Sequence, residues 1–193
     1  MKNILLIGGS TGIGYELSQK LKEDNNLFIA TRDKEKFNDT NIKTKDLNLN
    51  HEFETDWLPD HIDGFVYLPG TINLRPFKGL KPSVFLEDFK INVMGCVEIL
   101  QKVLPKIQAA KNPSIVMFST VAVKLGMPFH SSVSSSKGAI EGLTRALAAE
   151  FAPKIRVNTI APSILETPMS EKFLNSETKL DNAKNRHPLK EIG

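Results

Sequence analysis

The chain has 193 residues, which corresponds to one domain that is long enough to bury a sizeable core without disulfide or metal staples. Apolar residues make up 40% and charged residues 24%, which excludes an intrinsically disordered chain. The net charge of +3 is spread along the chain without a basic block, so neither nucleic acid nor a membrane is expected as a partner. The single cysteine, Cys96, cannot form an internal disulfide and favours a reducing, cytoplasmic compartment.

Short apolar runs bounded by turn residues alternate with longer segments of helical period. The runs predict strands that are buried on both faces, at residues 4–7, 27–31, 64–68, 114–119 and 155–160. None of them approaches the ~20 residues that a membrane span needs. Apolar positions three and four residues apart predict helices within residues 13–21, 85–107 and 140–151. This alternation predicts an α/β fold: a doubly wound, Rossmann-type parallel sheet with helices on both faces, forming a single domain over residues 1–193.

A glycine-rich turn follows the first predicted strand and opens the first predicted helix. It reads Gly8-Gly9-Ser10-Thr11-Gly12-Ile13-Gly14. Glycines allow a tight turn and let backbone N–H groups approach a phosphate, while the helix N-terminus adds positive potential. The spacing is not the G-x-G-x-x-G of the common dinucleotide fingerprint, and no Gly-Lys-Ser/Thr follows as in a triphosphate loop. The place of the turn between strand and helix nevertheless predicts a dinucleotide phosphate site.

The end of the second predicted strand bears on the choice of dinucleotide. Thr31, Arg32 and Asp33 stand there, about 20 residues beyond the glycine turn. An acidic residue at this place accepts from a ribose 2′-hydroxyl, whereas an arginine accommodates a 2′-phosphate. Arg32 follows the apolar run directly, so the sequence favours NADP(H), and Asp33 keeps NAD(H) as an alternative. No metal site is predicted.

Five segments, in the right order, resemble the short-chain dehydrogenase/reductase family over essentially the whole chain. They are residues 8–14, Asp46-Leu47, Asn92 within residues 91–95, residues 156–162, and Thr167-Pro168. The resemblance implies that Asp46 and Leu47 contact adenine and that Thr167 lies on the nicotinamide side. Together the motifs imply a cofactor site made of Gly8, Ser10, Thr11, Gly12, Ile13, Gly14, Thr31, Arg32, Asp46, Leu47, Gly70, Lys137, Pro162 and Thr167.

The chain departs from the family's pattern at the catalytic positions. The strand-four motif Asn-Asn-Ala-Gly is here Tyr-Leu-Pro-Gly, which retains only Gly70. Thr120 stands at the place of the catalytic serine, and the Tyr-x-x-x-Lys motif begins with Val133 and ends with Lys137. The chain also stops at Gly193, where relatives continue, so it is expected to be truncated, with the sixth strand an uncovered edge.

The missing tyrosine removes the family's proton donor. In the family the tyrosine supplies the proton, the lysine lowers its pKa and holds the ribose, and the serine hydroxyl polarises the carbonyl. A valine cannot donate a proton, and losing a positioned general acid typically costs ~10²–10⁴ in rate. His130, or Lys137 acting through a water fixed by Asn92, could replace it, while Thr120 could still orient a carbonyl. The other hydroxyl candidates are Ser131, Ser132 and Ser134.

The last part of the chain predicts a cover over the substrate. Residues 163–188 are polar and irregular and carry Met169, Phe173 and Leu174, which indicates a lid over an apolar substrate. The resemblance also implies a homodimer or homotetramer formed through the helix around residues 134–149 and the helix of residues 85–107.

Three functions are compatible with these features. The favoured one is an NADP(H)-dependent oxidoreductase that transfers a hydride to or from a small carbonyl or alcohol substrate, with a non-standard proton donor. The second is a dinucleotide-binding sensor or partner subunit without catalysis, which the valine at position 133 motivates. The third is an assembly component of an oligomer, whose pocket is vestigial.

Overall fold

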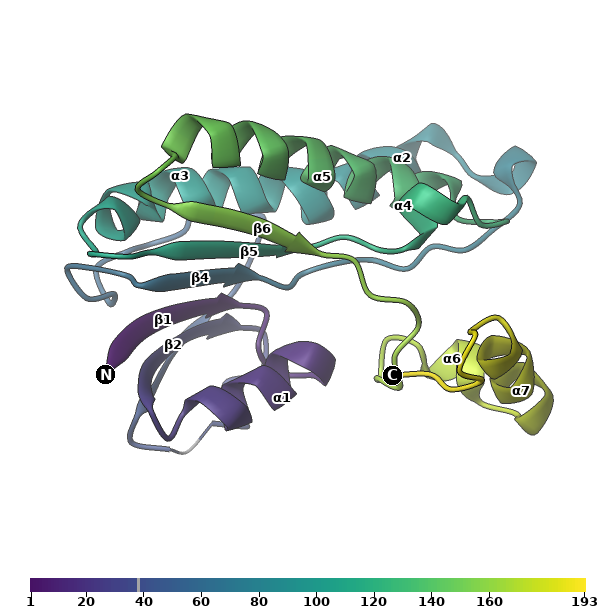
Figure 1. Ribbon diagram of the computed structural model, residues 1–193, viewed down its shortest axis with the longest axis horizontal. Helices are drawn as coiled ribbons and strands as arrows, with labels where there is room; N and C mark the ends of the chain where they lie inside the picture. The colour runs from purple at the N-terminus through teal and green to yellow at the C-terminus, as the bar shows by residue number, and fades with distance from the viewer. Residues whose placement is uncertain (38) are drawn as a thin grey trace.

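A computed structural model describes residues 1–37 and 39–193 and confirms the predicted doubly wound sheet (Figure 1). Six strands, all paired in parallel, lie in the order β3-β2-β1-β4-β5-β6. The strands are β1 (Lys2–Ile7), β2 (Asn25–Thr31), β3 (Ile42–Asp46), β4 (Gly64–Tyr67), β5 (Ser114–Phe118) and β6 (Arg156–Ile160). The order reverses between β1 and β4, where open α/β sheets bind their ligands.

Helices cover both faces of the sheet, but unequally. In Figure 1, α1 lies on one side, whereas α2, α3 and α5 form a layer on the other. The helices are α1 (Gly12–Leu21), α2 (Pro82–Phe89), α3 (Gly95–Gln108), α4 (Ala122–Leu125), α5 (Ser131–Phe151), α6 (Glu171–Leu174) and α7 (Glu177–Asn185), with a 3₁₀ turn, η1 (Phe77–Gly79), before α2. No helix in the described part of the chain is long and apolar enough to cross a membrane.

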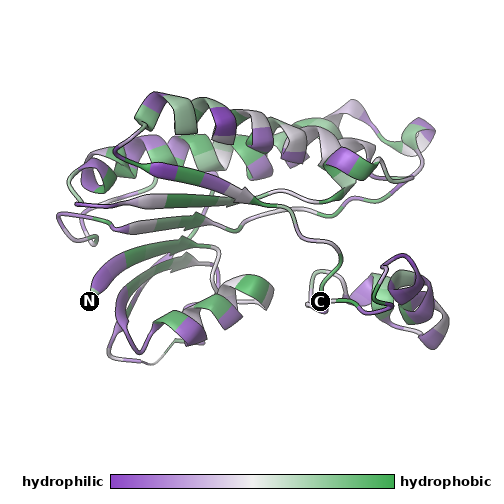
Figure 2. Cartoon of the chain, viewed as in Figure 1, coloured by the Kyte–Doolittle hydropathy of each residue, from purple (hydrophilic) through white to green (hydrophobic). Residues whose placement is uncertain are grey.

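The two faces of β1 feed two separate cores. Leu5 and Ile7 point into the larger core, beneath α3 and α5, while Leu6 points into a smaller core packed against α1. All three side chains are fully buried. Figure 2 shows apolar residues along the strands between the layers and mostly hydrophilic residues on α7. The continuous apolar runs of the sequence therefore arise because the sheet is covered on both faces.

The helix predicted over residues 85–107 is one continuous rod with a defect in its middle. The segments α2 and α3 are joined by a π-helical turn, η2 (Lys90–Met94), which contains Asn92. A π turn widens the helix and turns side chains out of the 3.6-residue register, and such turns are frequent at functional sites. The apolar stripe of the sequence gave no sign of this turn, because apolar spacing alone does not distinguish it from a regular helix.

The far end of the sheet is less covered than the centre. As predicted, β6 forms an edge. On the side of the sheet that carries α1, Phe118 is only partly buried, and Ile160, which pairs with it, remains 50% exposed. Beyond the carboxyl ends of the strands, α6 and α7 form the segment predicted as a lid, which a long connection joins to β6 (Figure 1).

We expect Leu5→Ala to lower the free energy of unfolding by about 2–5 kcal/mol, because it opens a cavity at a fully buried site on the central strand. Urea denaturation followed by circular dichroism measures the change. Leu189→Ala is the matched control, since Leu189 is 84% exposed, and its effect should stay within about 0.5 kcal/mol. Equal losses in the two variants would contradict the described core.

Candidate functional site

The glycine turn after β1 leaves no room for side chains. Gly8 and Gly12 have φ values of +86° and +52°, which L side chains rarely adopt. A Cβ on Gly14 would lie 2.5 Å from the Gly8 carbonyl oxygen, and one on Gly9 would lie 2.6 Å from Cγ2 of Ile29. The turn is therefore built so that α1 begins directly against β1, as a cradle for a phosphate requires.

The N-terminus of α1 is open. Thr11, the N-cap residue, makes no side-chain capping bond, and the first turn of α1 holds no acidic residue. The first backbone N–H groups of a helix need acceptors from outside the helix. Because the helix dipole adds positive potential here, the predicted residues Ser10, Thr11, Gly12 and Ile13 surround a site suited to a pyrophosphate.

The end of β2 places a basic side chain beside this turn. Thr31 is buried, and its hydroxyl accepts from the backbone N–H of Asp33 at 3.4 Å, so it shapes the turn. Its carbonyl accepts from the N–H of Leu47 at 2.9 Å, which ties the ends of β2 and β3 together. Arg32, directly after β2, is exposed. The predicted residues Arg32 and Leu47 thus lie at the same edge of the sheet.

The predicted adenine contact Asp46 is already engaged by a side chain. Lys34 Nζ lies 2.7 Å from Asp46 Oδ2, and the Asp46 side chain is 70% exposed. An exposed pair of this kind contributes little to stability. Asp46 can therefore exchange this partner for another hydrogen-bond donor at low cost.

Asn92 and Gly70 meet Lys137 at the carboxyl end of β4. A Cβ on Gly70 would lie 3.3 Å from both Asn92 Oδ1 and Lys137 Nζ, so both atoms border the same space. Asn92 is fully buried, and its Nδ2 donates to Thr71 Oγ1 at 2.9 Å and to the carbonyl of Asp88 at 2.8 Å. Its Oδ1 is buried with no hydrogen-bond partner among the described residues. A buried acceptor left without a donor is costly and points to a missing ligand or water.

Lys137 is a buried ammonium group. The residue is only 7% exposed, and no carboxylate in the described ranges lies within ion-pair distance of it. Burial lowers the pKa of Lys137 from 10.5 to about 8. The same burial raises the pKa of Cys96 to about 12, which keeps its thiol neutral. Lys137 therefore titrates close to neutral pH, where general acids and bases act best.

The other positions that the sequence analysis connected with catalysis are Val133, Thr120 and His130, and each has its own surroundings. Val133 lies one turn before Lys137 on α5 and is 6% exposed. Thr120 Oγ1 accepts from the N–H of Ala122 at 3.3 Å and still has a proton to donate. His130 precedes α5, and its Nδ1 lies 2.7 Å from the carbonyl oxygen of Pro128. A carbonyl only accepts, so Nδ1 carries the proton and donates it to Pro128.

A hydrogen-bonded cluster supports Asn92, and sequence reasoning missed its centre. Asp88 is fully buried, and its two carboxylate oxygens accept from Asn73 Nδ2 at 2.7 Å and from Ser132 Oγ at 2.5 Å. Ser132 is thus bound to a carboxylate rather than free as a proton donor. The cluster joins the loop after β4, α2 and the first turn of α5. The signal available in the sequence was a charged residue within the apolar stripe, four positions before Asn92.

The segment predicted as a lid touches the glycine turn. A Cβ on Gly12 would lie 3.2 Å from the Cβ of Thr167, so the predicted nicotinamide-side residue packs directly over the turn. The carbonyl of Pro162 accepts from the N–H of Val121 at 3.1 Å, which places the start of the lid beside the end of β5. Ser163 Oγ and His187 Nε2 lie 2.6 Å apart and close the lid segment on itself.

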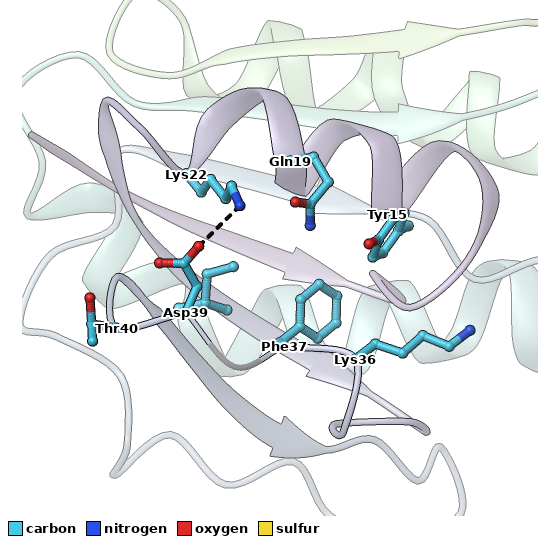
Figure 3. Close-up of a pocket in the computed structure, with 8 residues that line it drawn as sticks. Tyr15, Gln19, Lys22, Lys36, Phe37, Asp39 and Thr40 are labelled. Atoms are coloured by element: carbon cyan, nitrogen blue, oxygen red, sulfur yellow. Dashed lines mark ion pairs between the residues drawn. The ribbon is translucent and has the colours of Figure 1, made fainter.

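A separate hollow lies between α1 and the segment that leads into β3. It has a volume of about 430 Å³, and it is lined by Tyr15, Gln19, Lys22, Lys36, Phe37, Asp39, Thr40 and Ile42 (Figure 3). An ion pair of 3.0 Å between Lys22 and Asp39 crosses it. Ile42 begins β3, so this end of the hollow lies away from the strand ends that carry the site. No group of three His, Cys, Asp or Glu side chains that could hold a metal occurs in residues 1–37 and 39–193.

The arrangement fits a nicotinamide dinucleotide. It has an uncapped helix N-terminus, a turn that excludes side chains, and an unpartnered buried acceptor on Asn92 next to a buried ammonium. A pyrophosphate suits the uncapped helix N-terminus, and ribose hydroxyls suit the Asn92 acceptor and the ammonium. Hydride transfer coupled to movement of one proton is the chemistry that such a site can support.

Comparison with known proteins leads to the same class of protein, a dinucleotide-dependent reductase or dehydrogenase. A profile described as enoyl-(acyl carrier protein) reductase matches residues 47–193. The chain is 25% identical over 208 positions to the human protein "dehydrogenase/reductase SDR family member 2, mitochondrial", covering 98% of this chain and 74% of that relative. It is 36% identical over 104 positions to the 3-oxoacyl-[acyl-carrier-protein] reductase FabG of Thermotoga maritima, covering 53% of this chain and 42% of that relative.

A solved structure described as ElxO with NADP bound shares the whole fold. The TM-score is 0.88 at 26% sequence identity, and the match covers 100% of this chain and 86% of that one. The agreement extends over the glycine turn, the switch point of the sheet and the segment after β6.

We expect Gly14→Ala to destabilise the protein by more than about 1 kcal/mol, because its Cβ would lie 2.5 Å from a backbone oxygen that cannot move freely. Thermal unfolding measures this effect in the absence of any ligand. Gly142→Ala is the matched control, since nothing lies within 4 Å of its Cβ on α5 and alanine favours a helix. The control should gain up to about 1 kcal/mol, and a stable Gly14→Ala variant would contradict the close approach of α1 to the turn.

Proposed function

The chain belongs to the short-chain dehydrogenase/reductase family of oxidoreductases, and we propose that it transfers a hydride between NADP(H) and a small carbonyl or alcohol substrate, with Lys137 as the proton donor. The observation that carries this proposal is the space in front of Gly70. Lys137 Nζ and the unpartnered Asn92 Oδ1 border it together, and the position of the family's tyrosine is occupied by Val133.

The glycine turn and the start of α1 would hold the pyrophosphate. Arg32 would face the phosphate of the adenosine ribose, and Thr167, from the lid, would lie at the other end of the turn. A dinucleotide bound there supplies or accepts the hydride. The NADP in the structure of ElxO, a relative of the same fold, supports the phosphorylated form of the cofactor.

Lys137 would supply the proton to the oxygen of the reduced carbonyl. Its ammonium is buried without an anion, so it loses a proton more readily than an exposed lysine does. Asn92 Oδ1 can accept from that ammonium or from a water between ammonium and substrate, which fixes the direction of the transfer. The Thr120 hydroxyl proton, free of the Ala122 contact, would orient the carbonyl oxygen.

A reduction that uses Lys137 as its acid should slow as the pH rises through about 8, because the ammonium loses its proton there. The measurement is the rate of NADPH oxidation against pH with a panel of aldehydes, ketones and a 3-oxoacyl thioester, chosen because one relative is named a 3-oxoacyl reductase. Lys137→Ala should lower the rate by ~10²–10⁴, whereas Lys124→Ala, an exposed lysine on α4, should leave it unchanged. A Lys137→Ala variant as active as the wild type would overturn the assignment.

Burial of Lys137 should also cost stability. The pKa is about 8 in the folded protein and 10.5 when the lysine is exposed, so the unfolded state holds the proton more tightly between these values. Stability linked to this group therefore increases from pH 8 to pH 10.5. Lys137→Met should raise the free energy of unfolding at pH 7 by about 1–3 kcal/mol and remove that increase. Denaturant titrations at pH 7 and pH 10 test this, and a destabilised methionine variant would contradict the unpaired burial.

The second candidate is a dinucleotide-binding sensor without catalysis. The observation that favours it is the buried valine at position 133, which fills the donor's place with an apolar side chain. Tight NADPH binding without turnover of any substrate in the panel, together with a gain of activity in Val133→Tyr, would replace the enzyme proposal with this one.

We also propose that the chain associates with itself through the α2–α3 rod and α5. Three large apolar side chains, Leu86, Phe89 and Met94, remain 72%, 41% and 40% exposed along the first half of that rod. Small residues on α5 would allow close approach of a second copy. Light scattering of the purified chain decides between a monomer, dimer and tetramer.

A further inference from the structure

A serine and a histidine meet in the segment after β6. Ser163 Oγ lies 2.6 Å from His187 Nε2, although the two residues are 24 positions apart in the sequence. Both residues are partly exposed, so the pair is within reach of a dissolved molecule. The proposed hydride transfer does not use either side chain. A serine hydroxyl bound to an imidazole nitrogen is the arrangement in which a serine becomes a nucleophile.

The C-terminal end of α7 determines which nitrogen of His187 carries the proton. His187 Nδ1 lies 2.9 Å from the carbonyl oxygen of Ala183. Because a carbonyl only accepts, Nδ1 is the protonated nitrogen, and in the neutral imidazole Nε2 is then an acceptor. The Ser163 hydroxyl therefore donates to Nε2, which makes His187 a base for the hydroxyl proton.

Backbone hydrogen bonds hold the imidazole in this orientation. The N–H of His187 donates to the carbonyl of Lys184 at 2.9 Å, and the carbonyl of His187 accepts from the N–H of Lys190 at 3.1 Å. Ala183, whose carbonyl orients the ring, is only 6% exposed. The base is thus oriented by a third group, as in a catalytic triad, with a main-chain carbonyl in place of the carboxylate. The partial negative charge at the C-terminal end of a helix also stabilises the imidazolium that forms when the proton moves.

Ser163 stands at the edge of the sheet where small molecules bind. The carbonyl of Pro162, one residue earlier, accepts from the N–H of Val121, just beyond β5. Thr167, four residues later, packs over the glycine turn. The segment therefore crosses the carboxyl ends of the strands, which is the usual ligand site of such sheets. The N–H groups of Ser163 and Ile164 have no backbone acceptor among the described residues, so two donors are available for an oxyanion formed at the serine.

We propose that Ser163 and His187 form a hydrolytic site for carboxylic esters, with Ser163 as the nucleophile and His187 as the base. Ser163 Oγ attacks the acyl carbon while its proton moves to Nε2 of His187. The bond from the acyl carbon to the alcohol oxygen then breaks, and the imidazolium gives its proton to the departing alkoxide, which leaves an acyl-serine. Water attacks the acyl-serine, again passing a proton through His187, and releases the carboxylic acid and the serine hydroxyl. No dinucleotide takes part, so this inference does not rest on the proposed function.

The chemistry of the pair favours esters over amides as substrates. An uncharged carbonyl stabilises an imidazolium less than the carboxylate of a Ser-His-Asp triad does. The reaction therefore needs the more reactive acyl compound, and an alkoxide leaves more readily than an amine. Ile164 and Leu165, which follow the serine, are apolar and only partly buried, so a short aliphatic acyl group suits the site.

The test uses the full chain without any dinucleotide, an alkyl fluorophosphonate as a serine label and p-nitrophenyl butyrate as the substrate. Mass spectrometry of peptides should find the phosphonyl adduct on Ser163. Ser163→Ala should lower the hydrolysis of the ester to the rate in buffer. His187→Gln, which removes the base, should lower the rates of labelling and hydrolysis by ~10²–10⁴. Ser135→Ala and His51→Gln are the matched controls, and because both residues are exposed and lie outside the pair, both rates should stay unchanged.

The labelling of the wild type decides the matter even if a variant does not fold. An adduct on Ser163 that forms in the wild type and is lost in a folded His187→Gln variant supports the proposal. A folded wild type in which Ser163 stays unlabelled overturns it, and so does a His187→Gln variant that is labelled at the wild-type rate. Thermal unfolding of each variant shows whether it is folded. Neither result bears on hydride transfer, which is measured separately with NADPH.

Discussion

The double burial of β1 is the constraint on which the rest of the structure depends. This strand pairs on both edges, with β2 and β4, and sends alternate side chains into two cores. Its carboxyl end is therefore fixed in every direction, and the glycine turn starts from that fixed point. Because Gly14 lies against the carbonyl of Gly8, α1 begins at a set distance and angle from the strand. The proposed phosphate site depends on this contact, because it fixes the position of the helix N-terminus.

The second half of the site is held by polar groups in the larger core. Asp88 is buried and binds Asn73 and Ser132, while its backbone carbonyl accepts from Asn92. The π turn presents Asn92 Oδ1 toward Gly70, where it meets Lys137. Buried polar groups that lack some of their hydrogen bonds lower the stability of the folded protein. Proteins keep such groups where a ligand or a reaction uses them. The unpartnered Asn92 Oδ1 and the buried Lys137 ammonium, which border the same space in front of Gly70, are such groups.

Around the carboxyl ends of β2 and β3, where the adenosine is proposed to bind, the charges are arranged in exchangeable pairs. Lys34 is paired with Asp46 and Lys36 with Asp33, all four side chains being well exposed. Such pairs contribute little to folding, so a ligand can replace either partner at low cost.

The fold class could be predicted from the sequence, and the structure confirms it, whereas the list of site residues stays a prediction. Apolar runs bounded by turns predicted five of the six strands, and the glycine-rich turn predicted a phosphate site after β1, because both depend on local composition. It did not predict β3 from its pattern, since Ile42 is the single large apolar residue in that strand. Nor did it show the π turn at Asn92, the Asp88 cluster or the Ser163–His187 pair. These features appear only in the folded chain. Whether a polar side chain is buried without a hydrogen-bond partner, and the direction in which it points, depend on elements that are distant in the chain.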